Sequence, residues 1–469
     1  MTARRSARGV LALLMLFMML NFADKAVVGL TAEPIMDELG LSATAFGTVA
    51  GGFYLLFSAS AVLVGFLGNR VPIRPLLVGL ILIWSVAQLP IVIPGTGFAV
   101  LLSTRVLLGA GEGPGFPLAN HTAFTWFPEH RRALPSAAVT AGGALGAVLG
   151  GPLIILTIGL LGWRAAFGLL GVLGLLWLLA WLRYGGSGPY HVRAESGSAA
   201  DSGVPYRRII TTGTWLGGTF STFTVMWALA LGLAWLPLYL EDEAGFGKAA
   251  VGGLIGLPSV AAIILVLTVG TLAQSAVRRG VSRRIAYGVL GGTVTVLAGV
   301  CMLTLTRADA APLALLLVVV AFSAGTAQTP LVNAAIADTC PAGKRSAALG
   351  ISYAVAAVAS LLAPYVTGRL LDAAPTQSTG FTHAFDIAGW LLVAGGVMSM
   401  LVIRPDRDAA RHAAAPRHPA SPAEISISAS TSPFHATRIR GRGGSAIPPP
   451  DHPSAALIAA PDSTQMRKP

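Results

Sequence analysis

Charged residues are scarce in this 469-residue chain, because Asp, Glu, Lys and Arg together make up 11% of it, against about 25% in soluble domains. Cysteine is scarcer still: Cys301 and Cys340 are the two cysteines of the chain, so no disulfide framework is expected. Acidic residues number 20 against 32 Lys and Arg, which leaves a net charge of +12. These shortages exclude a soluble globular enzyme and a disulfide-stabilised scaffold.

Apolar residues dominate the chain instead. Hydrophobic residues make up 54% of the sequence, and the mean hydropathy is +0.71. A helix that crosses a bilayer needs about 20 mostly apolar residues. The stretches of that kind cover residues 9–30, 45–68, 74–94, 98–120, 136–160, 163–184, 213–240, 249–275, 284–305, 311–336, 346–371 and 383–404. We therefore predict an all-α membrane protein with twelve transmembrane helices.

A segment rich in Gly, Ser and Arg divides the predicted spans into two sets of six. We predict an N-terminal six-helix half over residues 1–184, a cytoplasmic linker over residues 185–212 and a C-terminal six-helix half over residues 213–404. Beyond these, the chain is rich in Pro, Ala, Ser and His. Such a composition cannot bury enough apolar surface to offset its chain entropy, so residues 405–469 are predicted to form a disordered cytoplasmic tail.

The basic residues lie mainly on one side of the predicted spans. If the N-terminus lies inside, the inner connections hold most of the Lys and Arg residues outside the tail, whereas the outer connections hold Arg164, Lys248 and Arg307. Because cationic loops resist translocation, both termini are predicted to be cytoplasmic. The positive charge therefore reflects membrane topology and does not indicate a nucleic-acid partner.

The two halves share short sequence similarities at their inner connections. Residues 65–70 after the second span resemble residues 270–274 after the eighth, and residues 128–132 before the fifth span resemble residues 341–345 before the eleventh. These similarities indicate an internal duplication of six helices. In transporters built this way the substrate site lies near the bilayer midplane, between the two halves.

Charged residues inside the predicted spans are the main functional signal. Asp24 and Lys25 lie in the first span, and Arg105 and Glu112 lie in the fourth. Each costs about 2.5–3.5 kcal/mol at a helix centre on insertion scales. A chain keeps such residues when they face partners, water or a ligand inside the helix bundle.

Helical spacing groups these side chains. Asn21, Asp24 and Lys25 stand at i, i+3 and i+4, which predicts one shared face. Arg105 and Glu112 are seven residues apart, so they share a face with a rise of about 10.5 Å between them. That separation is too long for a direct pair unless a ligand, water or another helix lies between. Glycines and prolines around Glu112 predict a bent fourth span that admits close helix approach.

Several short stretches carry a resemblance to a known family: 21–25, 105–117, 126–128, 162–164, 235–239 and 364–368. Through them the sequence resembles the major facilitator superfamily, and within it the anion:cation symporters, which carry sugar acids, phthalate and other organic anions. The matches run from about residue 20 to residue 372. Lys25 stands where that family usually has Arg, and Asn69 and Gln274 stand where it usually has acids that lock the inner gate.

Roles follow partly from charge and partly from this resemblance. A buried carboxylate is protonated more readily, so Glu112 and Asp24 are the predicted proton-coupling residues, with Lys25 expected to hold its neighbour Asp24 ionised. Lys25 and Arg105 supply positive charge for an organic anion. The resemblance implies proton coupling at Glu112 and an anion contact at Lys25.

Further residues are predicted to contact the substrate. The resemblance implies that Tyr54 reaches the central cavity and that Thr140 occupies a position where the family often has a polar cavity residue. Asn21 is added because it shares a helix face with Lys25. No metal-ligand spacing, phosphate-binding loop or nucleophile–base arrangement is found in the sequence, so no enzyme activity, metal or cofactor is expected.

The leading hypothesis is a secondary transporter that couples proton symport to a small organic anion, a carboxylate or sugar acid, by alternating access. It predicts a monomer in a bacterial inner membrane. One alternative is a proton-coupled exporter of drugs or metabolites from the same superfamily. A second is a non-transporting receptor that senses an anion. A third is that the four intramembrane charges form a purely structural ion-pair network.

Overall fold

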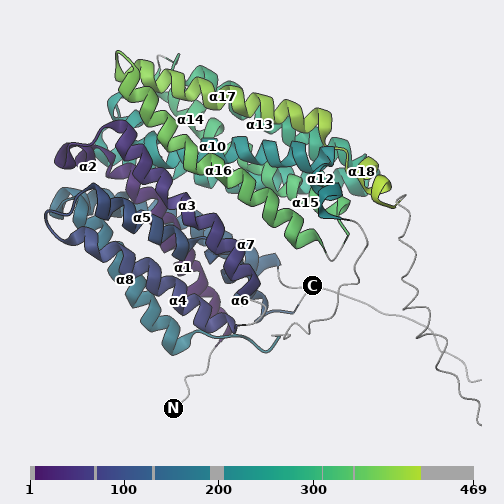
Figure 1. Cartoon of the computed structure of the whole chain (residues 1–469), viewed down its shortest axis with the longest axis horizontal. Coiled ribbons are helices and arrows are strands. Elements are labelled where there is room, and N and C mark those ends of the chain that lie inside the picture. The colour runs from purple at the N-terminus through teal and green to yellow at the C-terminus, as the bar shows by residue number, and fades with distance from the viewer. Residues whose placement is uncertain are drawn as a thin grey trace, which may run out of the picture. The chain divides into compact units, whose positions relative to one another are not determined.

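The computed structural model describes residues 6–67, 71–128, 133–190, 205–308, 310–341 and 344–413, and its regular elements are all helices (Figure 1). The first set comprises α1 (Ala7–Leu30), α2 (Ala32–Leu39), α3 (Ala43–Leu67), α4 (Ile73–Gln88), η1 (Leu89–Val92), α5 (Phe98–Glu112), α6 (Gly115–Phe124), α7 (Ala133–Leu161) and α8 (Trp163–Tyr184). The second set comprises α9 (Tyr206–Ile210), α10 (Gly213–Asp242), α11 (Lys248–Leu254), α12 (Leu257–Arg278), η3 (Arg284–Val289), α13 (Leu290–Leu305), α14 (Ala311–Ser323), η4 (Ala324–Ala327), α15 (Gln328–Thr339), α16 (Arg345–Ala373), α17 (Gln377–Val402) and α18 (Pro405–Ala413).

Within these ranges, 11 helical segments are long and apolar enough to cross a membrane. The remaining predicted span, residues 98–120, is built from two shorter helices, α5 and α6, which meet at Gly113 and Pro114. The break follows directly after Glu112, the last residue of α5. The all-α membrane fold predicted from hydropathy is confirmed, and the fourth span, predicted to bend and unwind locally, breaks at Gly113 and Pro114.

Glycines let the helices around this break approach closely. A Cβ atom on Gly109 would lie 1.8 Å from the carbonyl oxygen of Phe53, and one on Gly113 would lie 2.0 Å from that of Phe57. Both contacts are between α5 and α3, and any side chain larger than hydrogen would push the two helices apart. Small residues are a common means of close helix packing in membranes, and here they bring Glu112 within reach of α1 and α3.

The two sets of helices meet at the side that the charge bias predicts to be outer. A Cβ atom on Gly47 of α3 would lie 2.2 Å from the carbonyl oxygen of Pro364 in α16, and one on Gly51 would lie 2.4 Å from that of Leu361. Gly350 lies on the same face of α16 three turns further toward the inner side, and a Cβ atom there would meet nothing within 4 Å. Helices α3 and α16 therefore close the outer side and diverge toward the inner side.

Charged contacts reinforce this outer closure. The Asp372 carboxylate of α16 accepts hydrogen bonds from the backbone N–H groups of Ala43 (2.9 Å) and Thr44 (2.8 Å), which are free donors because α3 begins there. Lys248 of α11 contacts Glu33 of α2 at 2.5 Å. Each contact joins an element of the first set to an element of the second.

Replacing Asp372 with Asn is expected to shift the protein toward an outward-open state. The amide loses the charge-assisted hydrogen bonds to the start of α3, and a bond of that kind changes an equilibrium by about tenfold or more. The shift is measured as faster labelling, from outside, of a single cysteine introduced at Leu361. Asp386→Asn is the matched control, because Asp386 pairs with Arg307 within the second set of helices. Equal labelling rates in the two variants would show that Asp372 does not hold the closure.

A short helix follows the last predicted span. The sequence predicted an unstructured tail from residue 405, whereas Pro405–Ala413 forms α18; residues 414–469 lie outside the described ranges. The carboxylate of Asp408 accepts hydrogen bonds from the backbone N–H (2.9 Å) and the hydroxyl (2.8 Å) of Thr214. Burial alone would raise the pKa of Asp408, but these bonds and the Arg407 guanidinium hold that pKa below its ordinary value. Helix α18 is thereby tied to the start of α10.

Candidate functional site

An ion pair between α1 and α5 forms the centre of the candidate site. The Lys25 ammonium lies 2.6 Å from Glu112 Oε2, and the Asn21 side-chain amide donates to the same oxygen at 2.9 Å. Lys25 also donates to the side-chain oxygen of Asn21 at 2.5 Å. Helix α1 thus supplies the partner of Glu112. Another helix was one of the three options predicted to lie between Arg105 and Glu112, beside a ligand and water.

The position of Glu112 explains why these partners gather there. Glu112 ends α5, and the negative end of a helix dipole disfavours a carboxylate. Its side chain is fully buried, whereas 12% of the Lys25 side chain is exposed. Oε1 of Glu112 meets no hydrogen-bond partner in the described structure. Of the two charged groups in this pair, Lys25 is therefore the one that a ligand can contact.

Three phenylalanine rings surround the Lys25 ammonium. Its distances to the ring centroids of Phe22, Phe53 and Phe57 are 5.3, 5.7 and 5.7 Å, within the range of cation–π attraction. These rings keep bulk water from the ammonium on three sides and strengthen its attraction to any anion. Sequence reasoning did not select them, although Phe53 and Phe57 are spaced one helical turn apart.

Asp24 faces away from this ion pair. Its carboxylate accepts a hydrogen bond from the indole N–H of Trp84 in α4, and the residue is 1% exposed. The sequence predicted one face for Asn21, Asp24 and Lys25 and a Lys25–Asp24 partnership; the structure instead pairs Lys25 with Glu112. Consecutive residues on a helix point about 100° apart, so these two neighbours contact different helices.

Arg105 occupies the interior on the Asp24 side of α1. It is 1% exposed, and its guanidinium lies 4.8 Å from the ring centroid of Phe167. It acts electrostatically on Asp24 and, more weakly, on Glu112. A group so fully buried cannot contact a substrate in this conformation, so its predicted role as a substrate contact is not supported by the geometry. Its position suits charge coupling between the two acids.

Tyr54 lies beside the ion pair, toward the second set of helices. Its ring packs edge-on against Phe53 with centroids 4.9 Å apart, and it is close enough to Glu112 and to Tyr353 of α16 to interact electrostatically with both. Tyr353 is 39% exposed. The two tyrosines therefore approach each other from opposite halves near Glu112.

Thr140 lies further toward the inner side, on α7. Its hydroxyl donates to the carbonyl of Ser136 at 3.0 Å, and the residue is exposed. Gly151 lies three turns along the same face of α7, and a Cβ atom there would lie 2.0 Å from the carbonyl oxygen of Gly252 in α11. Thr140 thus faces the second set of helices but makes no described contact with the Lys25–Glu112 pair.

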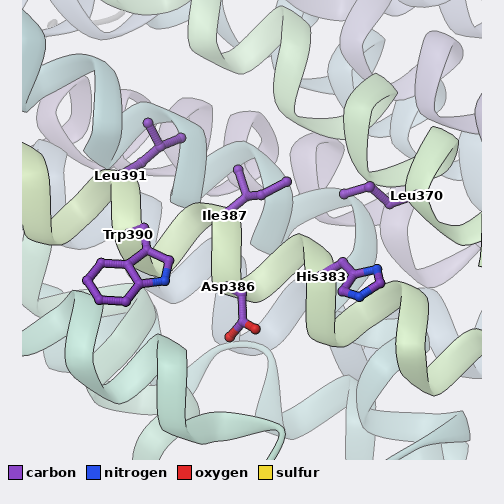
Figure 2. A pocket seen from close by; sticks show the side chains of 6 residues that line it. All are labelled: Leu370, His383, Asp386, Ile387, Trp390 and Leu391. Carbon is purple, nitrogen blue, oxygen red and sulfur yellow. The ribbon is translucent and has the colours of Figure 1, made fainter.

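A pocket on the second set of helices lies apart from these residues. Figure 2 shows its lining from α16 and α17: Leu370, His383, Asp386, Ile387, Trp390 and Leu391. Arg307 holds the Asp386 carboxylate through two hydrogen bonds of 3.0 and 3.1 Å, and the indole of Trp390 is largely exposed. The pocket contains no residue predicted for the substrate or proton site. Over the described ranges, no group of three or more His, Cys, Asp or Glu side chains is placed to hold a metal ion.

Known proteins share the sequence pattern and the fold of this chain. The sequence pattern of the Major Facilitator Superfamily matches residues 14–306 and 278–443. The chain is 26% identical to the hexuronate transporter of Bacillus subtilis (strain 168), over 84% of this chain and 94% of that protein. It is 28% identical to a probable sulfoacetate transporter of Cupriavidus necator, over 84% of this chain and 93% of that protein.

Solved structures show the same fold at lower identity. A D-xylose–proton symporter superposes with a TM-score of 0.67 at 15% identity, covering 86% of this chain and 99% of the symporter. A bacterial homologue of the human lysosomal transporter Spinster superposes with a TM-score of 0.68 at 17% identity, covering 88% of this chain and 100% of the homologue.

Proposed function

Because the chain belongs to the Major Facilitator Superfamily, we propose that this multi-pass membrane transporter is a proton-coupled symporter of a small organic anion, a carboxylate or sugar acid. The anion binds at Lys25, Glu112 carries the coupled proton with Asp24 as a second proton-binding residue, and the two halves alternate between outward-open and inward-open states. The similarity to hexuronate and sulfoacetate transporters supports the substrate class.

One observation carries this proposal: the slightly exposed cation of the site is already paired with a fully buried acid. The Lys25–Glu112 contact of 2.6 Å is electrically neutral as a unit. An organic anion that binds Lys25 leaves Glu112 as an uncompensated carboxylate in an apolar site, which is strongly unfavourable. Protonation of Glu112 removes that penalty and frees Lys25 for the substrate. Proton binding and anion binding therefore stabilise each other at one site.

The outer contacts of Asp372 and Lys248 support the alternating-access part of the proposal, because they hold closed the side where the halves meet. The bias of Lys and Arg toward the inner connections supports cytoplasmic termini. The bacterial relatives support placement in a bacterial inner membrane. We propose that the transporting unit is a monomer, since the Lys25 site is formed within one chain.

The proposal is tested by substrate-evoked proton movement in reconstituted vesicles. A panel of a hexuronate, an aldonate, a short dicarboxylate, an aromatic carboxylate and sulfoacetate is added outside, and internal pH is recorded. Internal acidification with one class of acid would support symport and identify the class. Proton efflux with cationic drugs would make the protein an antiporter, and binding of an anion without any flux would make it a receptor.

A further inference from the structure

A group of buried polar atoms without partners lies around the Asp24 carboxylate. The atoms are Oδ1 of Asp24, both side-chain amide atoms of Gln88, and Nε and Nη2 of Arg105. Each of these three residues is 1% exposed. Buried polar atoms in native proteins almost always have a protein or water partner. Unsatisfied atoms concentrated around one carboxylate therefore point to bound water.

Helix α4 builds one wall of this space. Trp84 and Gln88 stand one helical turn apart on α4, and the Trp84 indole donates to Asp24. Gln88 lies within hydrogen-bonding reach of the Asp24 carboxylate, yet neither of its amide atoms reaches a partner with ordinary hydrogen-bond geometry. Gly111 of α5 allows the helices to close over the space, since a Cβ atom there would lie 3.0 Å from the Trp84 Cβ.

The charged groups that act on Asp24 come from one neighbouring helix. Arg105 and Glu112 of α5 both act on it, while Lys25 on its own helix is turned to Glu112. Helix α4 contributes the uncharged Trp84 and Gln88. Helix α7 carries no charged residue, and the charged residues of α8 and α10 stand at the ends of those helices.

We propose that Asp24, Trp84, Gln88 and Arg105 enclose a water-filled chamber, separated by α1 from the Lys25 site, and that Trp84 and Gln88 are positioning residues for protonation of Asp24. The proposal rests on the proton-coupled function above. The proposal adds two uncharged residues of α4, Trp84 and Gln88, to the charged residues of the site. They define a second polar site around Asp24, whereas the anion binds at Lys25.

The chemistry of the two α4 side chains fits the two states of a carboxyl group. An indole N–H is a donor only, so Trp84 matches ionised Asp24. A protonated carboxyl group must donate its proton to an acceptor, which Trp84 cannot provide. The Gln88 amide has both a donor and an acceptor, so it matches either state directly or through water. Together the two residues keep Asp24 hydrogen-bonded before and after it takes up a proton from the chamber water.

Replacing Trp84 with Phe tests the positioning role through the pH profile of transport. The loss of a donor to ionised Asp24 is expected to move the half-maximal pH of substrate-evoked proton uptake upward by about one unit. The KM for substrate at saturating proton concentration is expected to stay unchanged. Trp177→Phe is the matched control, because both indoles pack on Phe17 and Trp177 donates instead to the backbone carbonyl of Leu13. An unshifted Trp84→Phe profile, or an equal shift in the control, would overturn the role of Trp84.

Gln88→Leu provides a second variant if Trp84→Phe does not fold. It removes the acceptor for protonated Asp24, so proton-coupled uptake is expected to slow by about tenfold while counterflow exchange persists. Equal loss of coupled uptake and counterflow exchange would indicate a general packing defect and contradict a positioning role for Gln88.

Water in the chamber is tested without any transport assay. X-ray footprinting of the intact protein oxidises side chains that lie beside bound water. Trp84 is fully buried and is expected to be oxidised several-fold faster than the buried Trp177, whose N–H is satisfied by a backbone carbonyl. Equal protection of both would overturn the chamber. Because this readout needs no substrate, a failure of the chamber is distinguishable from a failure of the proposed symport.

Discussion

Glu112→Gln is expected to abolish accumulation of substrate driven by a pH gradient while preserving exchange of substrate across the membrane. The amide has nearly the shape of the carboxyl group and still offers Lys25 an oxygen acceptor, but it cannot take up or release a proton. In the wild type, Glu112 must be protonated before Lys25 is free for an anion. In the variant Lys25 is already free, so the anion binds and exchanges without a coupled proton.

The two activities are measured in the same vesicles, as substrate-evoked acidification and as counterflow of labelled substrate. Glu38→Gln is the matched control in the same half, because Glu38 pairs with Arg164 and accepts from the Trp163 indole, whereas Glu112 pairs with Lys25. It is expected to retain both activities. Gradient-driven accumulation in Glu112→Gln at the wild-type rate would show that the proton is carried elsewhere.

The fold was predictable from sequence because the bilayer imposes a single solution on apolar segments. Backbone groups in lipid must be hydrogen-bonded within the chain, so a run of about 20 apolar residues becomes a helix. The exception is the fourth span, where Pro114 and its neighbouring glycines divide the helix into α5 and α6. Those residues predicted a bend and local unwinding, and the structure locates the break directly after Glu112, where Gly109 and Gly113 pack against α3.

The sequence predicted which charged residues form the candidate site, but it did not predict which of them pair with each other. The cost of intramembrane charge selected Asp24, Lys25, Arg105 and Glu112, and the structure brings all four together around α1. Which acid pairs with Lys25 depends on the rotation of α1, and local spacing cannot report that rotation because the partners lie about 90 residues away in sequence. For the same reason nothing in the sequence distinguished Trp84 from other apolar residues of its span.

Replacing Lys25 with Met is expected to weaken substrate binding strongly and to destabilise the protein. A charged hydrogen-bond partner for the anion contributes about 1.5–3 kcal/mol, so the affinity falls by roughly 10- to 150-fold. The variant also leaves Glu112 without its ion-pair partner, and breaking a buried pair costs about 3–5 kcal/mol. Substrate binding is measured by calorimetry on purified protein, and stability by thermal unfolding in the same detergent.

The double variant Lys25→Met/Glu112→Gln separates these two effects. Removing both charges eliminates the uncompensated carboxylate, so stability is expected to recover toward that of the wild type. Substrate affinity is expected to stay low, because no cation remains at the anion site. Lys25→Arg is the conservative comparison and is expected to bind substrate, since a guanidinium grips a carboxylate through two parallel hydrogen bonds. Recovery of binding in the double variant would show that the anion is held by another group, and Lys25 would then serve only to neutralise Glu112.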